Sequence, residues 1–465
     1  MFKKYQPVFL FLLILFSEQG FSQNYDNDKL PSSFHAARRQ ELRTKMEANS
    51  VAVIFANPVR NRSNDVDFQY SQDPNFYYLT GLTEPDAVLL IFKETQKFDS
   101  VSTQELIYIQ PRNIAAESWT GKRLGVEGVK KELGFGTVLT NVQFSDIKLD
   151  FTKFSKVYHS KLWEDVRNGK DDEGDLYSLI KIFNEKSEGA KKTKASFDFQ
   201  TIMAELREIK TAEEMKVLKK AITISCDAHL DLMRCLDQEM SEYQAQALVE
   251  FGFKFNGSEY PGYPTIAGAG ENTCILHYIS NRKKFVNKDL IVCDAGAEYH
   301  GYTADITRTL PVSGKFTDDQ KKIYSIVLNA QNAGIKACKK GNNFRDPHNE
   351  AVEVIKKGLI ELGIINSPND FMKYFFHGTS HYLGLDVHDP GSYGRLKPGQ
   401  VITVEPGIYI PEGSPCDKKW WNIGIRIEDD ILITEGEPDV LSGKLPKTIE
   451  EIEKMMNEPC FLKKN

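Results

Sequence analysis

The sequence predicts a mixed α/β (α+β) protein built from separate domains. The chain has 465 residues, and at roughly 100–200 residues per domain this length suggests two or three of them. In the first half, short apolar runs rich in β-branched residues alternate with stretches of helical periodicity, which is typical of α/β structure. A lysine-rich segment at 184–194, followed by a helix-starting motif at 211–214, indicates a change of domain.

The composition excludes several classes of protein. Hydrophobic residues make up 41% and charged residues 27%, which excludes intrinsic disorder, collagen and a disulfide-dense miniprotein. Lys and Arg number 59 and Asp and Glu number 65, so the formal charge is −6. This mild acidity gives no general attraction to nucleic acid or to an anionic membrane, and we expect neither as a partner.

Residues 1–22 have the layout of a secretory signal peptide. A lysine-containing start precedes nine apolar residues, Val8 to Phe16, and small residues follow at Gly20 and Ser22. Nine residues are too few to span a bilayer, which needs about 20, and no Cys follows that could carry a lipid. We expect cleavage after Ser22, no stable membrane anchor, and a protein exported to the periplasm or secreted.

The cysteines give no disulfide framework. Seven occur, at 226, 235, 274, 293, 338, 416 and 460, with irregular spacings and without a C-x-x-C motif. An exported protein could pair some of them. We expect most to be small buried side chains, and the sequence assigns no disulfide.

In the first half, residues 34–49 have charged, helical spacing and predict a helix. The apolar runs 51–56, 87–92 and 106–109 are bounded by turn residues and predict strands, with helical stretches between them. The segment 184–194 predicts a solvated loop close to a domain boundary near residue 195.

The second region opens with a capping box. Thr211 can accept a hydrogen bond from the backbone N–H three residues on, and Glu214 can reach back to Thr211. Apolar residues at helical spacing extend this helix to about residue 236, and we expect His229 to be an ordinary helix-face histidine rather than a ligand. Further helices are predicted at 318–339, 346–363 and 448–457.

Two aspartates are expected to face each other across a hairpin. Residues 290–293 predict a buried strand ending in Asp294, and 301–311 predict a return strand containing Asp305. A tight turn centred on 299–300 would place the two residues directly opposite, with Cβ atoms about 5 Å apart. Two such carboxylates repel each other, and a bound cation reverses that effect.

A second segment concentrates histidines. His377, His381 and His388 lie within twelve residues, between glycines and apolar residues. A single histidine is usually a core or surface residue. Three in one such segment favour a functional site, because neutral imidazole is both a metal ligand and a proton carrier.

Two further strands end in acidic residues. The alternating strand at 401–404 leads into Glu405, followed by a turn at 406–407. In the segment 423–429, Arg426 and Glu428 share one face, so Arg426 can brace Glu428 and nearby carboxylates. Taken singly, each strand is better explained by an ordinary edge charge.

Together the four segments predict a dinuclear metal hydrolase. Their carboxylates carry a charge of −4, which two divalent cations would neutralise. Oxygen-rich ligation with one imidazole suits Mn²⁺, Co²⁺ or Zn²⁺ better than a soft metal. Two metals about 3.5–4 Å apart can activate a bridging water and polarise a carbonyl. The five candidate ligands are Asp294, Asp305, His381, Glu405 and Glu428.

The order of these residues resembles the pita-bread metallopeptidases, which include methionine aminopeptidase, prolidase and aminopeptidase P. The segments at 68–92 and 117–125 resemble the N-terminal domain of aminopeptidase P, and the resemblance spans 34–451. It implies a creatinase-like α/β domain at 34–195 and a pita-bread catalytic domain at 203–456. The blocks that carry it are ILHYISN (275–281), DAGAEYHGYTADITRT (294–309), HGTSHYLGLDVHD (377–389), TVEPGIYI (403–410) and GIRIEDD (424–430).

The resemblance assigns a role to each ligand. Asp294 would bind one metal, and Asp305 and Glu428 would bridge both. His381 and Glu405 would hold the other metal. Glu405 would also act as the general base that takes the proton from the bridging water. Of the three candidate metals, the resemblance favours a pair of Mn²⁺ ions.

The resemblance also implies work for residues around the metals. His277, His377 and His388 match three further active-site histidines, expected to hydrogen-bond the scissile carbonyl, the gem-diolate and the leaving amine. Arg426 would fix the orientation of the ligands from outside the metal shell.

The implied activity is that of an Xaa-Pro aminopeptidase, which releases the first residue of peptides with proline at position 2 through a metal-bridging hydroxide. The Xaa-Pro bond lacks an N–H and the ring fixes φ, so its cleavage calls for a shaped pocket. Tyr260 and Tyr263 resemble part of that pocket, and a purely structural loop is an equal alternative.

Alternative functions follow from the same superfamily. Prolidase, which cleaves Xaa-Pro dipeptides, shares all five ligands and is the alternative activity. Methionine aminopeptidase is disfavoured because it lacks a comparable first domain. A non-catalytic binding protein is disfavoured because every ligand position is kept. The resemblance also suggests a homo-oligomer, a dimer or a tetramer.

Overall fold

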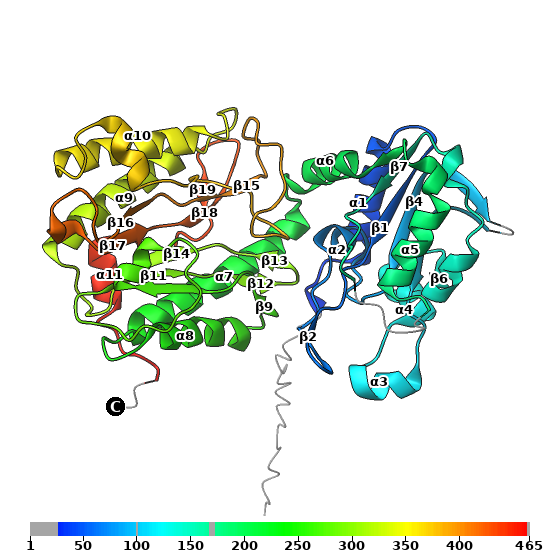
Figure 1. The fold of residues 1–465 in the computed structure, drawn as a ribbon, viewed down its shortest axis with the longest axis horizontal. Coiled ribbons are helices and arrows are strands. Elements are labelled where there is room, and N and C mark those ends of the chain that lie inside the picture. Colours follow the sequence, from blue (N-terminus) through cyan, green and yellow to red (C-terminus); the bar gives the residue numbers. More distant parts are fainter. Residues whose placement is uncertain (1–26, 99–100, 167–172, 463–465) are drawn as a thin grey trace, which may run out of the picture.

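The computed structural model describes residues 27–98, 101–166 and 173–462. They form two parts side by side, an N-terminal part around one sheet and a C-terminal part in which strands lie between helices (Figure 1). The mixed helix and strand content predicted from the sequence is confirmed. The predicted signal peptide, residues 1–22, lies outside the described residues.

A mixed sheet forms the centre of the N-terminal part. Its described strands have the order β6-β5-β4-β1-β7-β8, and β1 is antiparallel to β4 and parallel to β7. Strand β1 is buried along its whole length, as its apolar sequence predicts. The bounds are β1 Ser50–Phe55, β4 Val88–Phe98, β5 Val101–Ile109, β6 Val138–Thr140, β7 Lys156–His159 and β8 Lys194–Ala195, with a separate hairpin of β2 Asn61–Ser63 and β3 Val66–Asp67.

The bounds of two helices in this part differ from the sequence prediction. The predicted helix 34–49 is α1, which begins at Ser32 and ends at Lys45. The predicted loop 184–194 is wrong at its start, because residues 184–186 complete α5, which Asp175 caps through the N–H of Ser178. The bounds are α1 Ser32–Lys45, α2 Pro74–Thr80, α3 Ile114–Thr120, α4 Gly125–Leu133, α5 Leu176–Lys186 and α6 Ser196–Arg207, with 3-10 turns at Asn141–Asp146, Phe151–Lys153 and Glu188–Ala190.

The C-terminal part opens with the long helix α7, Ala212–Cys235, and the predicted capping box is confirmed. The N–H of Thr211 donates to Glu214 Oε2 at 2.9 Å, and the N–H of Glu214 donates to Thr211 Oγ1 at 3.2 Å. His229 is buried on this helix, with Nε2 at 3.1 Å from the carbonyl oxygen of Ala295. It is therefore a hydrogen-bonded core residue, as expected.

The remaining helices enclose short antiparallel ladders. In Figure 1, α8 lies below the strands and α10 lies above them. The three predicted helices are α9, α10 and α11, confirmed to within two residues at each end. The helices are α8 Glu242–Phe255, α9 Asp318–Ala337, α10 Asp346–Glu361 and α11 Ile449–Met455, with 3-10 turns at Gly270–Cys274, Pro368–Lys373 and Lys418–Trp420.

The described ladders have the orders β10-β11-β14, β13-β12-β9, β15-β18-β19 and β16-β17. In these antiparallel ladders the end of one strand lies beside the start of the next. Asp294 at the end of β11 lies beside Thr307 at the start of β14, and Val404, which precedes Glu405, lies beside Asp429 at the start of β18. The bounds are β9 Tyr260–Pro261, β10 Ile266–Ala269, β11 Leu290–Asp294, β12 Ala297–Tyr299, β13 Tyr302–Thr303, β14 Thr307–Pro311, β15 Val401–Val404, β16 Gly407–Ile410, β17 Ile423–Arg426, β18 Asp429–Leu432 and β19 Asp439–Val440.

The predicted hairpin register is wrong by two residues. Asp294 pairs with Thr307, not with Asp305, because the turn is centred one residue later than expected. His300 and Gly301 both have positive φ, 47° and 83°, and a two-residue turn of this kind matches the right-handed twist of its strands. Glycine takes such a φ without strain, which explains why the turn includes Gly301.

The structure pairs two of the cysteines, for which the sequence assigns no disulfide. Cys235, the last residue of α7, forms a disulfide with Cys460 near the end of the described chain. Cys226, Cys293 and Cys338 are buried thiols, as predicted. Within the described residues, no helix is long and apolar enough to cross a membrane.

Candidate active site

Asp294 and Asp305 lie together although they are not directly opposed. The strands approach closely at Gly296, where a Cβ atom would lie 1.7 Å from the carbonyl oxygen of Ala304. The hydroxyl of Tyr263 lies 2.5 Å from Oδ1 of each aspartate. One hydroxyl proton can serve only one of these oxygens at a time, so the second carboxylate needs another positive partner.

Asp305, His381 and Glu428 converge on one point. One ligand atom from each lies within 4.8 Å of the other two, a spacing at which a single metal ion could be held. His381 Nε2 is 3.3 Å from Asp305 Oδ2. Its Nδ1 lies 3.0 Å from the carbonyl oxygen of Tyr382. A carbonyl only accepts, so Nδ1 carries the proton and Nε2 is free to act as a ligand.

Glu428 and Glu405 come from different ladders. Glu428 lies between β17 and β18, and its Oε2 accepts a hydrogen bond from Thr307 Oγ1 at 2.6 Å. Glu405 follows β15, and its N–H donates to the carbonyl oxygen of Thr379 at 2.9 Å. Its Oε1 lies 3.6 Å from His381 Nε2. The structure thus brings all five predicted ligands into one site.

Arg426 braces Asp294 rather than Glu428. Its Nη2 lies 2.7 Å from Asp294 Oδ2, and Nε donates to Thr307 Oγ1 at 3.2 Å. Because that hydroxyl donates to Glu428, Arg426 reaches Glu428 only through Thr307. The predicted brace on a nearby carboxylate is therefore found at Asp294, and the predicted brace on Glu428 is indirect, through Thr307.

The electrostatics of the cluster favour cations. Burial, together with the charges of Asp305, Glu405 and Asp294, raises the pKa of Glu428 well above its usual value. Burial and Asp294 raise the pKa of Asp305, and burial raises the pKa of Glu405 to about 7. Repulsion between buried carboxylates is reversed by a bound cation. This donor set, rich in oxygen with one imidazole, fits divalent metal ions.

Two residues at the site carried no distinct sequence signal. Asp430 is buried, its Oδ2 accepts from the N–H of Asp305 at 3.3 Å, and its Oδ1 has no partner among the described residues. The Tyr409 hydroxyl accepts from Arg426 Nη1 at 3.1 Å. The paired acids at 429–430 could have indicated Asp430, whereas Tyr409 looks like an ordinary strand residue.

The three predicted histidines differ in their surroundings. His377 has both ring nitrogens engaged, with Nδ1 at 2.7 Å from Gly378 O and Nε2 at 2.9 Å from the Tyr409 hydroxyl. Burial lowers the pKa of His377 to about 4. His388 is exposed, and its ring centroid lies 4.4 Å from that of His381. His277 is exposed. Burial, with the nearby charges of His381 and His277, lowers the pKa of His388.

The predicted pocket residues Tyr260 and Tyr263 point to different places. Tyr263 is directed at the two aspartates. Tyr260 donates its hydroxyl hydrogen bond to the carbonyl oxygen of Tyr70 in the N-terminal part. Tyr263 therefore belongs to the carboxylate cluster, whereas Tyr260 links the two parts of the chain.

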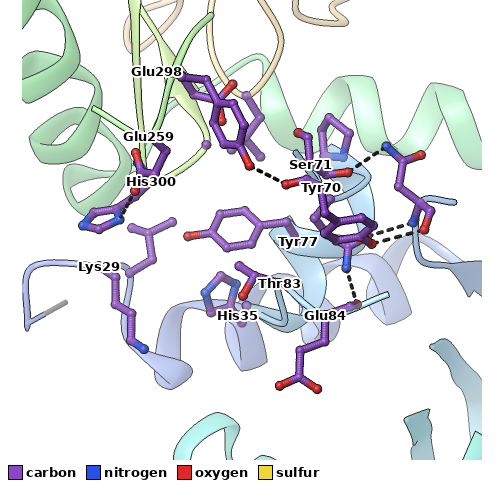
Figure 2. Close-up of a pocket in the computed structure, with 18 of the residues that line it drawn as sticks. Lys29, His35, Tyr70, Ser71, Tyr77, Thr83, Glu84, Glu259, Glu298 and His300 are labelled. Atoms are coloured by element: carbon purple, nitrogen blue, oxygen red, sulfur yellow. Dashed lines mark hydrogen bonds and ion pairs between the residues drawn. The ribbon is translucent and has the colours of Figure 1, made fainter. Parts of the chain in front are cut away.

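A cavity of about 1110 Å³ lies between the two parts and reaches His388. Figure 2 shows Glu259, Glu298 and His300 on the C-terminal side, across from Tyr77 and His35 on the N-terminal side. Both parts of the chain line this cavity, and among the predicted site residues it is lined by Tyr260 and His388.

Comparisons with known proteins agree with this geometry. A model of metallopeptidase family M24 matches residues 216–435, and a model of the aminopeptidase P N-terminal domain matches residues 35–158. The chain is 37% identical over 438 residues to an Xaa-Pro aminopeptidase of Escherichia coli K12, covering 90% of this chain and 96% of that protein.

Solved structures give the same result. The structure of E. coli aminopeptidase P with the inhibitor Pro-Leu matches with a TM-score of 0.82 and 34% identity, covering 92% of this chain and 98% of that one. A zinc-substituted E. coli aminopeptidase P with product matches with the same TM-score, 0.82, and the same 34% identity and coverage of 92% and 98%. The likeness confirms the predicted order of an aminopeptidase P N-terminal domain and a pita-bread domain.

Proposed function

We propose that this chain, which belongs to metallopeptidase family M24, is an Xaa-Pro aminopeptidase that uses two divalent metal ions. It would remove the first residue of peptides with proline at position 2. The observation that carries this proposal is the convergence of Asp305, His381 and Glu428, whose ligand atoms lie within 4.8 Å of one another. Asp294 shares the Tyr263 hydroxyl with Asp305, and Glu405 lies beside His381.

These five side chains would hold the metal ions, and Asp305 and Glu428 would serve both of them. Four carboxylates can neutralise two divalent cations, and the oxygen-rich set favours Mn²⁺, with Co²⁺ or Zn²⁺ as alternatives. The zinc-substituted relative supports a site that accepts more than one divalent metal. When bound, such ions activate a water molecule and polarise the scissile carbonyl.

Glu405 is the proposed general base. Its Oε1 lies 3.6 Å from His381 Nε2 in the cluster, where the carboxylate can accept a proton from the attacking water and release it again. Its Oε2 is 3.7 Å from His377 Nδ1, which places an imidazole beside the proton it receives.

His388 and His277 are the proposed partners of the peptide, because both rings are exposed at the site. A tertiary amide nitrogen must be protonated as it leaves, since it carries no hydrogen of its own. An imidazole can supply that proton or a hydrogen bond to the carbonyl. His377 acts through Tyr409 in this arrangement, since both of its nitrogens are already engaged.

The cavity between the two parts supports aminopeptidase rather than strict dipeptidase activity. A volume of about 1110 Å³ beside His388 has room for residues beyond a dipeptide. We propose that cleavage is limited to the first residue of the peptide by the N-terminal part, which lines the other side of this cavity. It would block extension of the peptide on the N-terminal side of the residue removed.

We also propose that the protein is exported. The signal-peptide pattern at 1–22 motivates this, and the Cys235–Cys460 disulfide supports it, since disulfides persist mainly in oxidising compartments. N-terminal sequencing of the protein recovered from cell fractions tests it. Recovery of an uncleaved chain in the cytoplasm would contradict export.

Metal-depleted protein reloaded with single metals tests the activity. We expect cleavage of Xaa-Pro-Xaa with Mn²⁺, weaker cleavage of an Xaa-Pro dipeptide, and none of Xaa-Ala-Xaa. Cleavage of the dipeptide alone would indicate a prolidase. Equal cleavage of Xaa-Ala-Xaa would contradict proline specificity.

A further inference from the structure

A buried ion-pair network holds the loop that carries His388. Arg207 Nη2 lies 2.5 Å from Asp389 Oδ1 and 2.7 Å from Asp386 Oδ2. Lys210 Nζ lies 2.9 Å from Asp389 Oδ2. The side chains of Arg207, Lys210 and Asp389 are exposed by only 2%, 1% and 1%. Buried charges are costly unless fully paired, so this network is strongly constrained to one geometry.

Asp389 organises the loop from within. Its Oδ1 accepts a hydrogen bond from the N–H of Asp386 at 3.1 Å, and its own N–H donates to the carbonyl oxygen of Tyr382 at 2.9 Å. These bonds fix the backbone on both sides of His388. No hydrogen bond from the described part of the chain reaches the His388 ring, so its placement depends on the loop backbone and on the contact with the His381 ring.

Arg207 also connects this loop to the N-terminal part. Its Nη1 donates to Asn75 Oδ1 on α2 at 2.8 Å. Arg207 is the last residue of α6, which packs against α1. One guanidinium therefore joins α2, the end of α6 and the His388 loop.

We propose that Arg207 is a positioning residue that holds Asp389, and through it the His388 loop, in register with the N-terminal part. This rests on the proposed function, in which His388 contacts the peptide. Through Asn75, Arg207 ties the placement of His388 to the wall of the cavity that the N-terminal part provides.

A double-mutant cycle on the metal-loaded enzyme tests this, with Arg207→Ala, His388→Ala and the double variant on one Xaa-Pro-Xaa tripeptide. We expect Arg207→Ala to lower kcat roughly 10- to 100-fold with little change in KM, because a small misplacement of a reacting group is costly. With alanine at position 388, the same change is expected to cost less than about twofold. If the loss of kcat in the double variant equals the product of the losses in the two single variants, the proposal is overturned.

Further variants separate positioning from folding. Arg207→Lys is expected to restore part of kcat, because it keeps a charge on Asp389. If Arg207→Ala does not fold, Asn75→Ala replaces it in the cycle, and its loss of kcat is compared with and without His388 in the same way. If His388→Ala turns over too slowly to measure, calorimetric binding of the dipeptide Pro-Leu to the same four proteins replaces kcat. If Arg207→Ala loses as much affinity for Pro-Leu with alanine at position 388 as with His388 present, the proposal is overturned.

Lys397→Ala is the matched control. Lys397 pairs at 2.7 Å with Glu208, the residue after Arg207, and its side chain is 54% exposed. We expect it to leave kcat within about twofold of wild type; a loss as large as that of Arg207→Ala would overturn a specific role for Arg207. Failure of the proposed function looks different, because His388→Ala would then retain wild-type turnover.

Discussion

The guanidinium of Arg426 lies 2.7 Å from the carboxylate of Asp294, Nη2 to Oδ2, with both side chains buried. Arg426 ends β17 and Asp294 ends β11, so the pair joins two strands that are 132 residues apart in the sequence. The ion pair fixes one oxygen of Asp294 and leaves the other facing Tyr263 and Asp305. Arg426 therefore decides which way this proposed metal ligand points.

Removing that brace is expected to weaken metal binding. Arg426→Ala leaves Asp294 free to rotate and is expected to reduce metal affinity roughly 10- to 100-fold, as is usual for partners that orient a ligand. Calorimetric titration of metal-depleted protein with Mn²⁺ measures this. Arg395→Ala is the control, since Arg395 is exposed and donates to the carbonyl oxygen of Gly341. Unchanged affinity in Arg426→Ala would contradict the role of Arg426.

Glu405→Gln tests the general base. It keeps the size of the side chain and removes the proton acceptor, so kcat is expected to fall on the order of 10²- to 10⁴-fold. The thermal unfolding midpoint should stay close to that of wild type, because relieving repulsion among buried carboxylates offsets the lost contacts. Glu412→Gln, at an exposed position, is the control. Wild-type kcat in Glu405→Gln would rule out the assignment.

His300 is expected to make stability depend on pH. Burial lowers the pKa of His300, but hydrogen bonds to Glu259 and Asp28 raise it overall. A raised pKa in the folded state means that the stabilisation is fully present below the unfolded value, about 6.5, and is lost as pH rises through the folded value. As pH rises across that window, the free energy of unfolding of wild type should therefore fall by up to about 1 kcal/mol relative to His300→Gln. The effect is limited to this size because Asp28 is partly exposed to solvent.

Urea unfolding of both proteins between about pH 5 and pH 9 measures this difference. His159→Gln is a control of opposite sign, because burial lowers the pKa of His159. There, wild type should lose stability relative to the variant as pH falls. A pH-independent difference for His300→Gln would contradict the ion pairs at Asp28 and Glu259.

The Cys235–Cys460 disulfide is expected to stabilise the C-terminal part. It spans 225 residues, and a bond closing so long a loop restricts the unfolded chain, with a typical effect of about 2–4 kcal/mol. Replacing both cysteines by serine should lower the free energy of unfolding by that amount. Cys416→Ser, which removes an unpaired thiol, is the control. An unfolding curve of wild type that does not respond to reductant would contradict the disulfide.

Sequence reasoning pointed to the site because Asp294 and Glu405 come at the ends of apolar strands and His381 lies in a histidine cluster. Asp294 and Glu405 follow buried strands in the structure as in the sequence. The hairpin register was wrong because turn residues, not strand patterns, set it, and His300–Gly301 takes the positive φ values. The partner of Arg426 depends on which strands neighbour each other, and that arrangement is tertiary.

Other features lie beyond what a single sequence determines. Cysteine connectivity cannot be deduced from spacing, so the pairing of Cys235 with Cys460 was missed. Tyr409 occupies an ordinary strand position and becomes significant only beside Arg426 and His377. Self-association as a dimer or tetramer and cleavage after Ser22 stay predictions.

The number of metal ions per chain tests the central claim most directly. Calorimetric titration of metal-depleted wild-type protein with Mn²⁺, with peptide cleavage followed in the same samples, should give two ions bound per chain and activity that appears as they bind. Asp305→Ala, which removes a ligand proposed to serve both ions, should lose the two bound ions and the activity. Full activity without bound metal would contradict a dinuclear centre at these five side chains. Full activity and wild-type metal binding in Asp305→Ala would contradict it too.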